Sequence, residues 1–174
     1  MSIQKYPMLV SIYKGEGRIL IIPVVDHIGG YSIDSSWFVN MENLQDYDEI
    51  GKNLFRALEF VRNSPLSKLT PKERELEAAW RVNSKYKSWI SFWKNNNFAY
   101  FKSFEDGHFQ VYSLKHSEKK KGGYGDCVKL IDLPSTVSTE EIGKAVVSVF
   151  EALENYYQNN KEQKDFLTKG KKFI

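Results

Sequence analysis

The stretch that decides the fold is FAYFKSFEDGHFQVYSL at residues 98–114, where two runs of aromatic and polar residues flank Asp106-Gly107. A two-residue type I′ turn requires positive φ at both central positions, and Asp-Gly is a pair that tolerates it. The stretch therefore predicts an antiparallel hairpin with Asp106 and Gly107 at its tip. Pairing outward from that turn places Phe101 opposite Tyr112.

Aromatic side chains occupy both faces of this predicted hairpin. In the pairing above, one face carries Phe98, Tyr100, Phe104, Phe109 and Val111, and the other carries Phe101, Tyr112 and Leu114. The hairpin is therefore either interior, with helices over both faces, or has one face free for a partner. We favour the core for most of these rings. Partner contacts are expected at the tip instead, at Glu105, Asp106 and His108.

Strand and helix patterns alternate along the rest of the chain. Apolar, β-branched runs typical of strands lie at 8–13, 18–25 and 128–133. Helix starts are indicated at 46–48, 70–73 and 138–141, and 89–93 fits a helix better than a strand. Glu-Ile-Gly-Lys occurs twice, at 49–52 and 141–144, which we interpret as two similar helix starts. These patterns predict an α/β (α+β) fold, a mostly antiparallel central sheet with the Asp-Gly hairpin, flanked by about three to four helices.

The composition is that of one ordinary domain. The chain has 174 residues, of which 41% are hydrophobic and 14% aromatic, enough to form a core. We expect residues 1–157 to form a single globular domain and the Lys-rich segment 158–174 to be a frayed or disordered tail. No apolar run approaches the roughly 20 residues of a membrane span, and the N-terminus lacks a signal-peptide pattern. A cytoplasmic protein without membrane contact is expected.

The residues able to support catalysis are few and scattered. The histidines are His27, His108 and His116, and the single cysteine is Cys127. His108 and His116 would lie on one side of a strand, but eight residues of strand separate them by about 26 Å, too far to share a metal ion. Cys127 has no histidine near it in the sequence and is expected to be a small core residue. We therefore expect no enzymatic activity, no metal or other cofactor, and no small-molecule substrate.

Charge is separated along the chain. The formal net charge of +3 arises within residues 161–174, which hold five Lys and two acidic residues, so residues 1–160 are neutral. An acidic segment lies at 42–49, with no Lys or Arg anywhere from 40 to 51. Such a segment can steer association with a basic partner. We expect its carboxylates to bind that partner: Glu42, Asp46, Asp48 and Glu49.

A basic cluster follows the hairpin and supports an alternative function. It consists of Lys115, Lys119, Lys120 and Lys121. A basic loop at 115–121 beside an aromatic hairpin is the combination that binds single-stranded nucleic acid. The neutral charge of residues 1–160 argues against it, because phosphate backbones require a concentrated positive field. We expect no nucleic acid as partner, and a nucleic-acid-binding module is the alternative reading.

Three segments together carry a family resemblance. They are GRILIIPVVDHIGGY at 17–31, DEIGKNLFRALEFVRNS at 48–64, and the hairpin followed by STEEIGKAVVSVFEALE at 138–154. In these segments the chain resembles the CdiI immunity proteins of bacterial contact-dependent growth inhibition. The resemblance implies a cytoplasmic α/β protein that forms a one-to-one complex with the toxic C-terminal domain of a CdiA effector, often a nuclease. It neutralises that domain in the cell that makes it and in its siblings. The shared patterns are strands and helices, so no functional residue is carried over.

Overall fold

The sheet contains every strand of the computed structural model, which describes residues 7–160. Its strands run in the order β3-β2-β1-β5-β6-β7, with β4 also paired to β2, and each neighbouring pair is antiparallel. The bounds are β1 Met8–Gly15, β2 Arg18–Asp26, β3 Ser32–Asp34, β4 Val39–Met41, β5 Asn97–Ser103, β6 Phe109–His116 and β7 Tyr124–Leu133. The predicted antiparallel sheet is confirmed.

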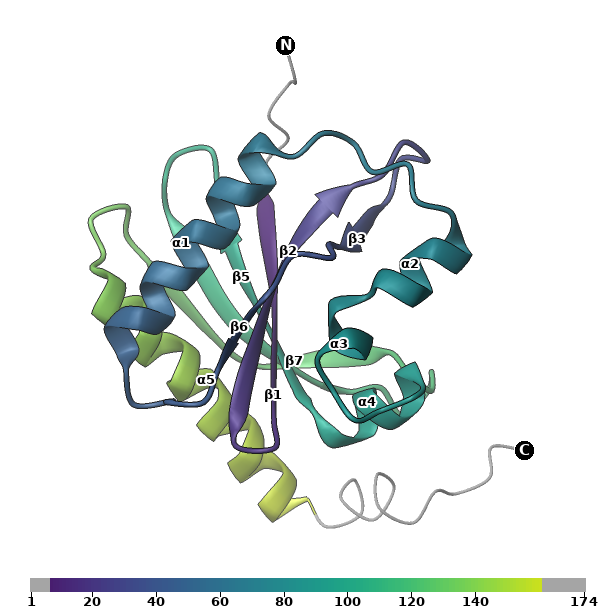
Figure 1. Ribbon diagram of the computed structural model, residues 1–174. Coiled ribbons are helices and arrows are strands. Elements are labelled where there is room, and N and C mark those ends of the chain that lie inside the picture. Colours follow the sequence, from purple (N-terminus) through teal and green to yellow (C-terminus); the bar gives the residue numbers. More distant parts are fainter. Residues whose placement is uncertain (1–6, 161–174) are drawn as a thin grey trace.

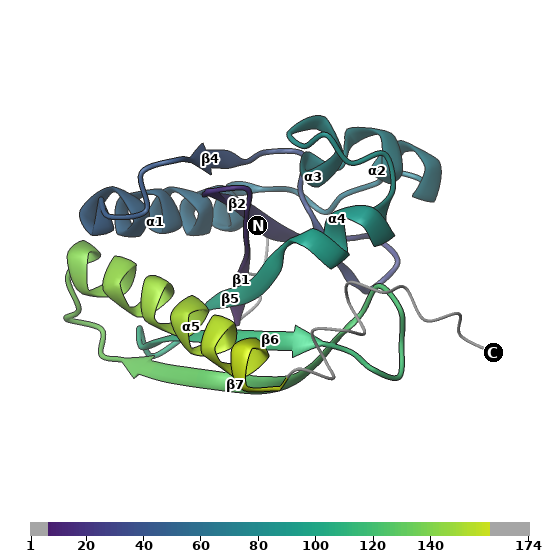
Figure 2. The same ribbon diagram turned by 90° about the horizontal axis from the view of Figure 1, so that it is seen from below.

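Helices cover both faces of the sheet (Figures 1 and 2). One face packs against α1 (Tyr47–Asn63) and α5 (Thr139–Asn159), and the other against the short helices α3 (Ala79–Val82) and α4 (Trp89–Asn95). Helix α2 (Pro71–Glu77) contacts α3 and buries none of its own residues. The α+β class is therefore confirmed. Within residues 7–160, no helix combines the length and the apolarity that crossing a membrane requires. Helix α5 continues past the predicted domain end at 157, and most of the predicted tail, 161–174, lies outside the described residues.

Helix starts follow the capping signals in the sequence. Thr70 and Ser138 each form a complete capping box, in which the side chain accepts from the backbone three residues on and a glutamate reaches back to the cap. Helix α4 begins behind the N-cap Ser88, so the helical interpretation of 89–93 is confirmed. Two indole groups of α4 hold the loop after β6 in place. The Nε1–H groups of Trp89 and Trp93 donate to the carbonyl oxygens of Gly122 and Gly123, at 2.7 and 2.8 Å.

The hairpin forms with a different register from the predicted one. Phe101 pairs with Val111, not with Tyr112. The turn is closed by the Gly107 N–H, which donates to the Phe104 carbonyl at 3.0 Å. Of the two expected turn residues only Gly107 has positive φ, at 87°, which excludes the type I′ turn and fits a longer loop with a glycine bulge. The extra loop residue shifts the pairing of the two strands by one position. Relative to β5, every side chain of β6 therefore lies on the opposite face of the sheet from the one predicted.

The corrected register sorts the aromatic residues into two cores. Phe109 and Val111 share the face of Phe101, under α1 and α5, rather than the face of Phe98. Phe98 and Phe101 are 2% and 0% exposed, so their core assignment is confirmed. On the Phe98 face, Tyr100 is only half-buried, as is its cross-strand neighbour Tyr112.

Strand β7 forms one edge of the sheet and corrects the expectation for Cys127. Ser113 pairs with Lys129 and Leu114 with Cys127, so Val128 is an extra residue in a β-bulge. The bulge interrupts the in–out alternation, and the thiol is exposed rather than in the core.

The starts of α1 and α5 cross at a reciprocal glycine contact. A Cβ on Gly51 would lie 2.0 Å from the carbonyl oxygen of Thr139, and a Cβ on Gly143 would lie 1.9 Å from that of Tyr47. The isoleucine before each glycine is fully buried. The repeated Glu-Ile-Gly-Lys motifs are two helix starts, as interpreted, and the structure adds that they pack against each other.

We expect Gly51→Ala and Gly143→Ala each to destabilise the protein by about 1–3 kcal/mol, because a methyl group there collides with backbone. Elsewhere in a helix the same change stabilises by about 1 kcal/mol, so the sign is diagnostic. Urea unfolding measures the effect. Gly125→Ala is the matched control, because its Cβ would meet nothing closer than 3.6 Å. A cost below about 0.5 kcal/mol for both helical variants would contradict the contact.

His116 joins three elements in the core. Its Nε2–H donates to the Trp93 carbonyl oxygen at 2.6 Å, and its Nδ1 lies 2.6 Å from the Tyr157 hydroxyl, which also accepts the His116 backbone N–H at 2.8 Å. Because a carbonyl can only accept, the neutral Nε2–H tautomer satisfies every group. The pKa of His116 lies below its ordinary value, because the effect of burial exceeds that of the hydrogen bonds to the backbone of Trp93 and Asn96, which raise it.

A histidine whose pKa is lower in the folded than in the unfolded state binds fewer protons when folded, so stability falls as pH drops below about 6.5. We expect the free energy of unfolding to decrease from pH 7.5 to pH 5.5, and to decrease less in His116→Gln, which cannot be protonated. Chemical denaturation at the two pH values tests this. Equal slopes for the parent and the variant would show that His116 does not control acid stability.

Candidate partner-binding surface

The residues predicted to bind a partner come from two segments that the fold brings to one side of the molecule. In Figures 1 and 2 the loop before α1, the turn between β5 and β6 and the loop before α5 all lie on the left. The turn touches the loop before α5, because a Cβ on Gly107 would lie 3.2 Å from the Ser135 Cβ. We call residues 42–49, 104–108 and 135–141 the acidic end.

Two of the predicted carboxylates hold helix starts in place. Asp46 is the N-cap of α1 and accepts from the Glu49 backbone N–H at 3.1 Å. Asp48 accepts from the Thr139 hydroxyl and forms an ion pair with Lys52 at 2.6 Å. The hydrogen bond from Lys52, followed by that from Thr139, holds the pKa of Asp48 below its ordinary value. These side chains therefore have structural partners within the chain.

The other two carboxylates differ from each other. The Glu49 Oε1 accepts from Asn53 at 3.1 Å and from Arg56 at 3.3 Å. Glu42 follows β4 directly, is exposed, and makes no hydrogen bond or ion pair with the described part of the chain. Glu42 is thus the carboxylate of this segment most available to a partner.

The hairpin tip is an ordered stack of side chains. The His108 ring lies on the Phe104 ring, with centroids 4.0 Å apart and planes 9° apart, and the Lys102 ammonium lies 4.6 Å from the Phe104 centroid. The carboxylate of Asp106 contacts the ring Nδ1 of His108, and this bond is the main cause that lowers the pKa of Asp106. Glu105 is exposed beside them. The tip therefore presents a fixed ring and a free carboxylate.

Sequence reasoning missed the contribution of α5 to this end. Glu140 forms an ion pair with Lys144 at 2.6 Å, and Glu141 accepts from the Ser138 backbone N–H at 2.9 Å. Both follow the N-cap of α5, beside the start of α1. The repeated Glu-Ile-Gly-Lys motif was the available signal, since two helices that cross at their starts bring both sets of N-terminal carboxylates together.

The basic loop and the aromatic hairpin do not form one surface. Lys115 pairs with Asp126 at 3.2 Å, and its loop follows the end of β6 opposite the hairpin turn. Phe98 and Phe101 are buried. These two buried rings cannot stack on bases, and the loop lies at the other end of β6 from the hairpin tip, so the arrangement does not favour the nucleic-acid-binding alternative.

The three histidines lie in three different parts of the structure. His27 lies 3.0 Å from the Leu69 carbonyl oxygen and stacks on Tyr31, His108 is at the tip, and His116 is in the core. Within residues 7–160 no three His, Cys, Asp or Glu side chains are arranged to hold a metal ion. The structure thus brings none of the histidines together.

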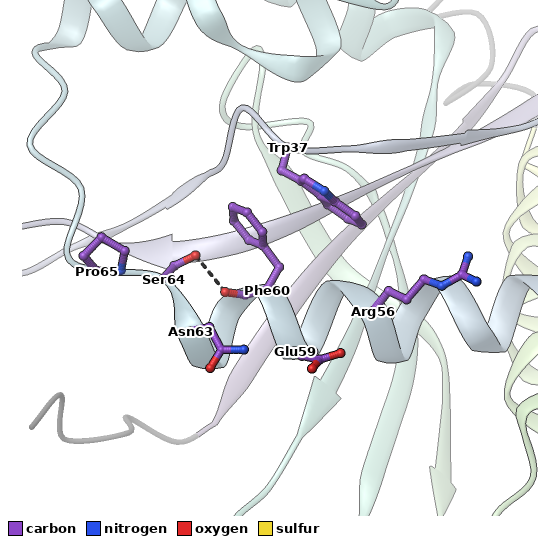
Figure 3. A pocket seen from close by; sticks show the side chains of 7 residues that line it. All are labelled: Trp37, Arg56, Glu59, Phe60, Asn63, Ser64 and Pro65. Atoms are coloured by element: carbon purple, nitrogen blue, oxygen red, sulfur yellow. Dashed lines mark hydrogen bonds between the residues drawn. The ribbon is translucent and has the colours of Figure 1, made fainter.

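A shallow pocket of about 460 Å³ lies along the C-terminal half of α1 (Figure 3). The Trp37 and Phe60 rings stack there, with centroids 5.4 Å apart. Ser64 Oγ donates to the Phe60 carbonyl at 2.7 Å and closes the helix end. The lining residues are Trp37, Arg56, Glu59, Phe60, Asn63, Ser64 and Pro65. This aromatic shelf lies away from the helix start that contributes to the acidic end.

Comparison with known proteins gives a likeness of fold. No protein-family model and no curated protein matches the chain. A protein of unknown function from Neisseria meningitidis superposes with a TM-score of 0.62 at 16% identity, over 87% of this chain and 98% of that one. A chain of the CdiA-CT/CdiI toxin and immunity complex from Yersinia pseudotuberculosis superposes with a TM-score of 0.62 at 13% identity, over 85% of this chain and 98% of that one.

The acidic residues of segment 42–49 are expected to differ in their contribution to the free energy of unfolding. We expect Asp46→Ala to lower the free energy of unfolding by about 1 kcal/mol, because the N-cap bond to α1 is lost. Glu42→Gln, a neutralisation without a lost contact, should change it by less than about 0.5 kcal/mol. Urea unfolding of the two variants makes the comparison. Equal stabilities would mean that Asp46 is only a surface charge.

Proposed function

We propose that this chain is an immunity protein that binds the toxic C-terminal domain of a CdiA-type effector, one-to-one, and neutralises it in the cytoplasm of the producing cell. The observation that carries the proposal is the superposition on a chain of a CdiA-CT/CdiI complex over almost the whole of that chain. The sequence resemblance at 17–31, 48–64 and 138–154 points to the same family. Binding rather than catalysis is the proposed activity.

The acidic end suits a toxin with a basic surface. A nuclease must attract phosphate groups, so its active-site face is expected to be cationic, and opposite charges accelerate association. We propose that the partner contacts Glu42, Asp46, Asp48, Glu49, Glu105, Asp106 and His108. Glu42 and Glu105 carry free charge, while the ordered Phe104–His108 stack supplies a rigid contact that loses little entropy on binding.

Co-expression tests the proposal. The chain should protect cells that express the effector domain encoded immediately upstream of it, and should co-purify with that domain as a one-to-one complex. The toxin's activity in vitro should be lost on addition of an equimolar amount of the chain. Failure to bind or protect, or hydrolytic or transferase activity of the isolated chain, would overturn the assignment.

Charge reversal identifies the surface within the same experiment. The pair Glu42→Lys and Glu105→Lys should slow association about tenfold at low salt, and the difference should shrink at high salt. Glu77→Lys with Glu151→Lys is the matched control, because both side chains are exposed on other parts of the molecule. If the control slows association as much as the test pair, general charge rather than the acidic end is responsible.

A further inference from the structure

Asp34 and a group of tyrosines form a second polar cluster, on the sheet face opposite α1 and α5. Asp34 is the last residue of β3, and its two carboxylate oxygens accept from the hydroxyls of Ser11 at 2.6 Å and Tyr13 at 2.7 Å. Both donors belong to β1, two strands away from β3. These bonds hold a three-residue strand on the sheet, which accounts for a side chain with two acceptor oxygens at this position.

The negative charge of Asp34 lacks a cation. Burial raises the pKa of Asp34, and only the hydrogen bonds from Ser11 and Tyr13 oppose it; no Lys, Arg or His within residues 7–160 contributes. Buried carboxylates are normally paired with a cation, because an uncompensated charge in a protein interior is costly. Part of the Asp34 surface is nevertheless open to solvent. The residue is thus only partly enclosed, although burial is the main influence on its carboxyl group.

A second, independent observation is the hydroxyl of Tyr124. It is buried and has no hydrogen-bond partner in the described part of the chain. Burial and then the charge of Asp34 raise the pKa of Tyr124 well above its ordinary value, and the same two causes raise the pKa of Tyr100 to about 12. Phe98 connects these groups, because its ring centroid lies 4.1 Å from that of Tyr124, 4.6 Å from that of Tyr100 and 5.0 Å from that of Tyr13, whose hydroxyl donates to Asp34.

We propose that the Asp34–tyrosine cluster binds a guanidinium group, carried by a partner's arginine or by a free small molecule. A guanidinium is planar and always charged, donates several hydrogen bonds and stacks on aromatic rings. Each oxygen of Asp34 can accept a second bond, and Tyr124 supplies a further acceptor. The hydrogen bonds from Ser11 and Tyr13 explain the position of Asp34. They do not neutralise its charge or give the Tyr124 hydroxyl a partner, and a cationic hydrogen-bond donor would do both. This inference goes beyond the proposed immunity function and does not depend on it.

The test titrates the full chain with agmatine and, separately, with N-acetyl-arginine amide, and follows the carboxyl and tyrosine ring signals by NMR. Saturable shifts with a Kd of about 10 mM or below are expected for at least one probe. Binding of the arginine amide alone assigns the site to a partner's side chain, and binding of agmatine alone assigns it to a small molecule. Calcium chloride and butylammonium at matched ionic strength should not reproduce the shifts.

Three variants decide the assignment. Asp34→Asn should weaken binding about tenfold or more. Asp132→Asn is the matched control, because Asp132 is exposed and lies at the far end of the same row of cross-strand neighbours. This variant should bind the probes as the parent protein does. Tyr124→Phe keeps the ring that stacks on Phe98, removes only the unpartnered hydroxyl, and should weaken binding about threefold without loss of stability. The absence of shifts with both probes, equal shifts with calcium, or undiminished binding by Asp34→Asn and Tyr124→Phe would overturn the proposal.

Discussion

The crossing of α1 and α5 at two glycines is the constraint on which the rest of the structure depends. Backbone meets backbone at Gly51 and Gly143, so the helices approach more closely than side chains would allow. Their fully buried isoleucines then share one core with Phe101 of β5 and Phe109 of β6 beneath both helices. The same contact fixes where the N-terminal ends of the helices emerge, and with them the carboxylates that cap these ends.

This geometry gives the acidic end a double character. The partial positive charges at two adjacent helix starts favour nearby carboxylates, so part of the acidity stabilises the helices. Asp46 and Asp48 are of this kind, with bonds to the backbone of α1 and to Thr139. Glu42 and Glu105 have no such partner among residues 7–160 and add negative charge facing solvent. An acidic segment in a sequence thus combines two physical roles that only the contacts can separate.

Local signals predicted much of the fold, and long-range contacts were largely hidden. The capping boxes at Thr70 and Ser138 and the apolar, β-branched runs of the strands are short-range patterns, and the structure follows them. The hairpin register was wrong because Asp-Gly suits more than one turn, and one additional loop residue exchanges the faces. Cys127 was placed in the core because nothing in the sequence marks a bulge. The pairing of Asp34 with β1 spans 23 and 21 positions and has no local signature.

The bulge in β7 also has a consequence for self-association. An outermost strand with a straight, apolar edge would invite another strand and lead to open-ended assembly. Within residues 7–160 no strand pairs with the outer edge of β7, yet Val128 interrupts its regular spacing and Asp126, Lys129 and Asp132 place charge along it. A second sheet that continued this one would have to match the irregular spacing and place its own strand beside those charges. The strand that ends the sheet is therefore also a barrier that favours a dispersed protein over aggregates.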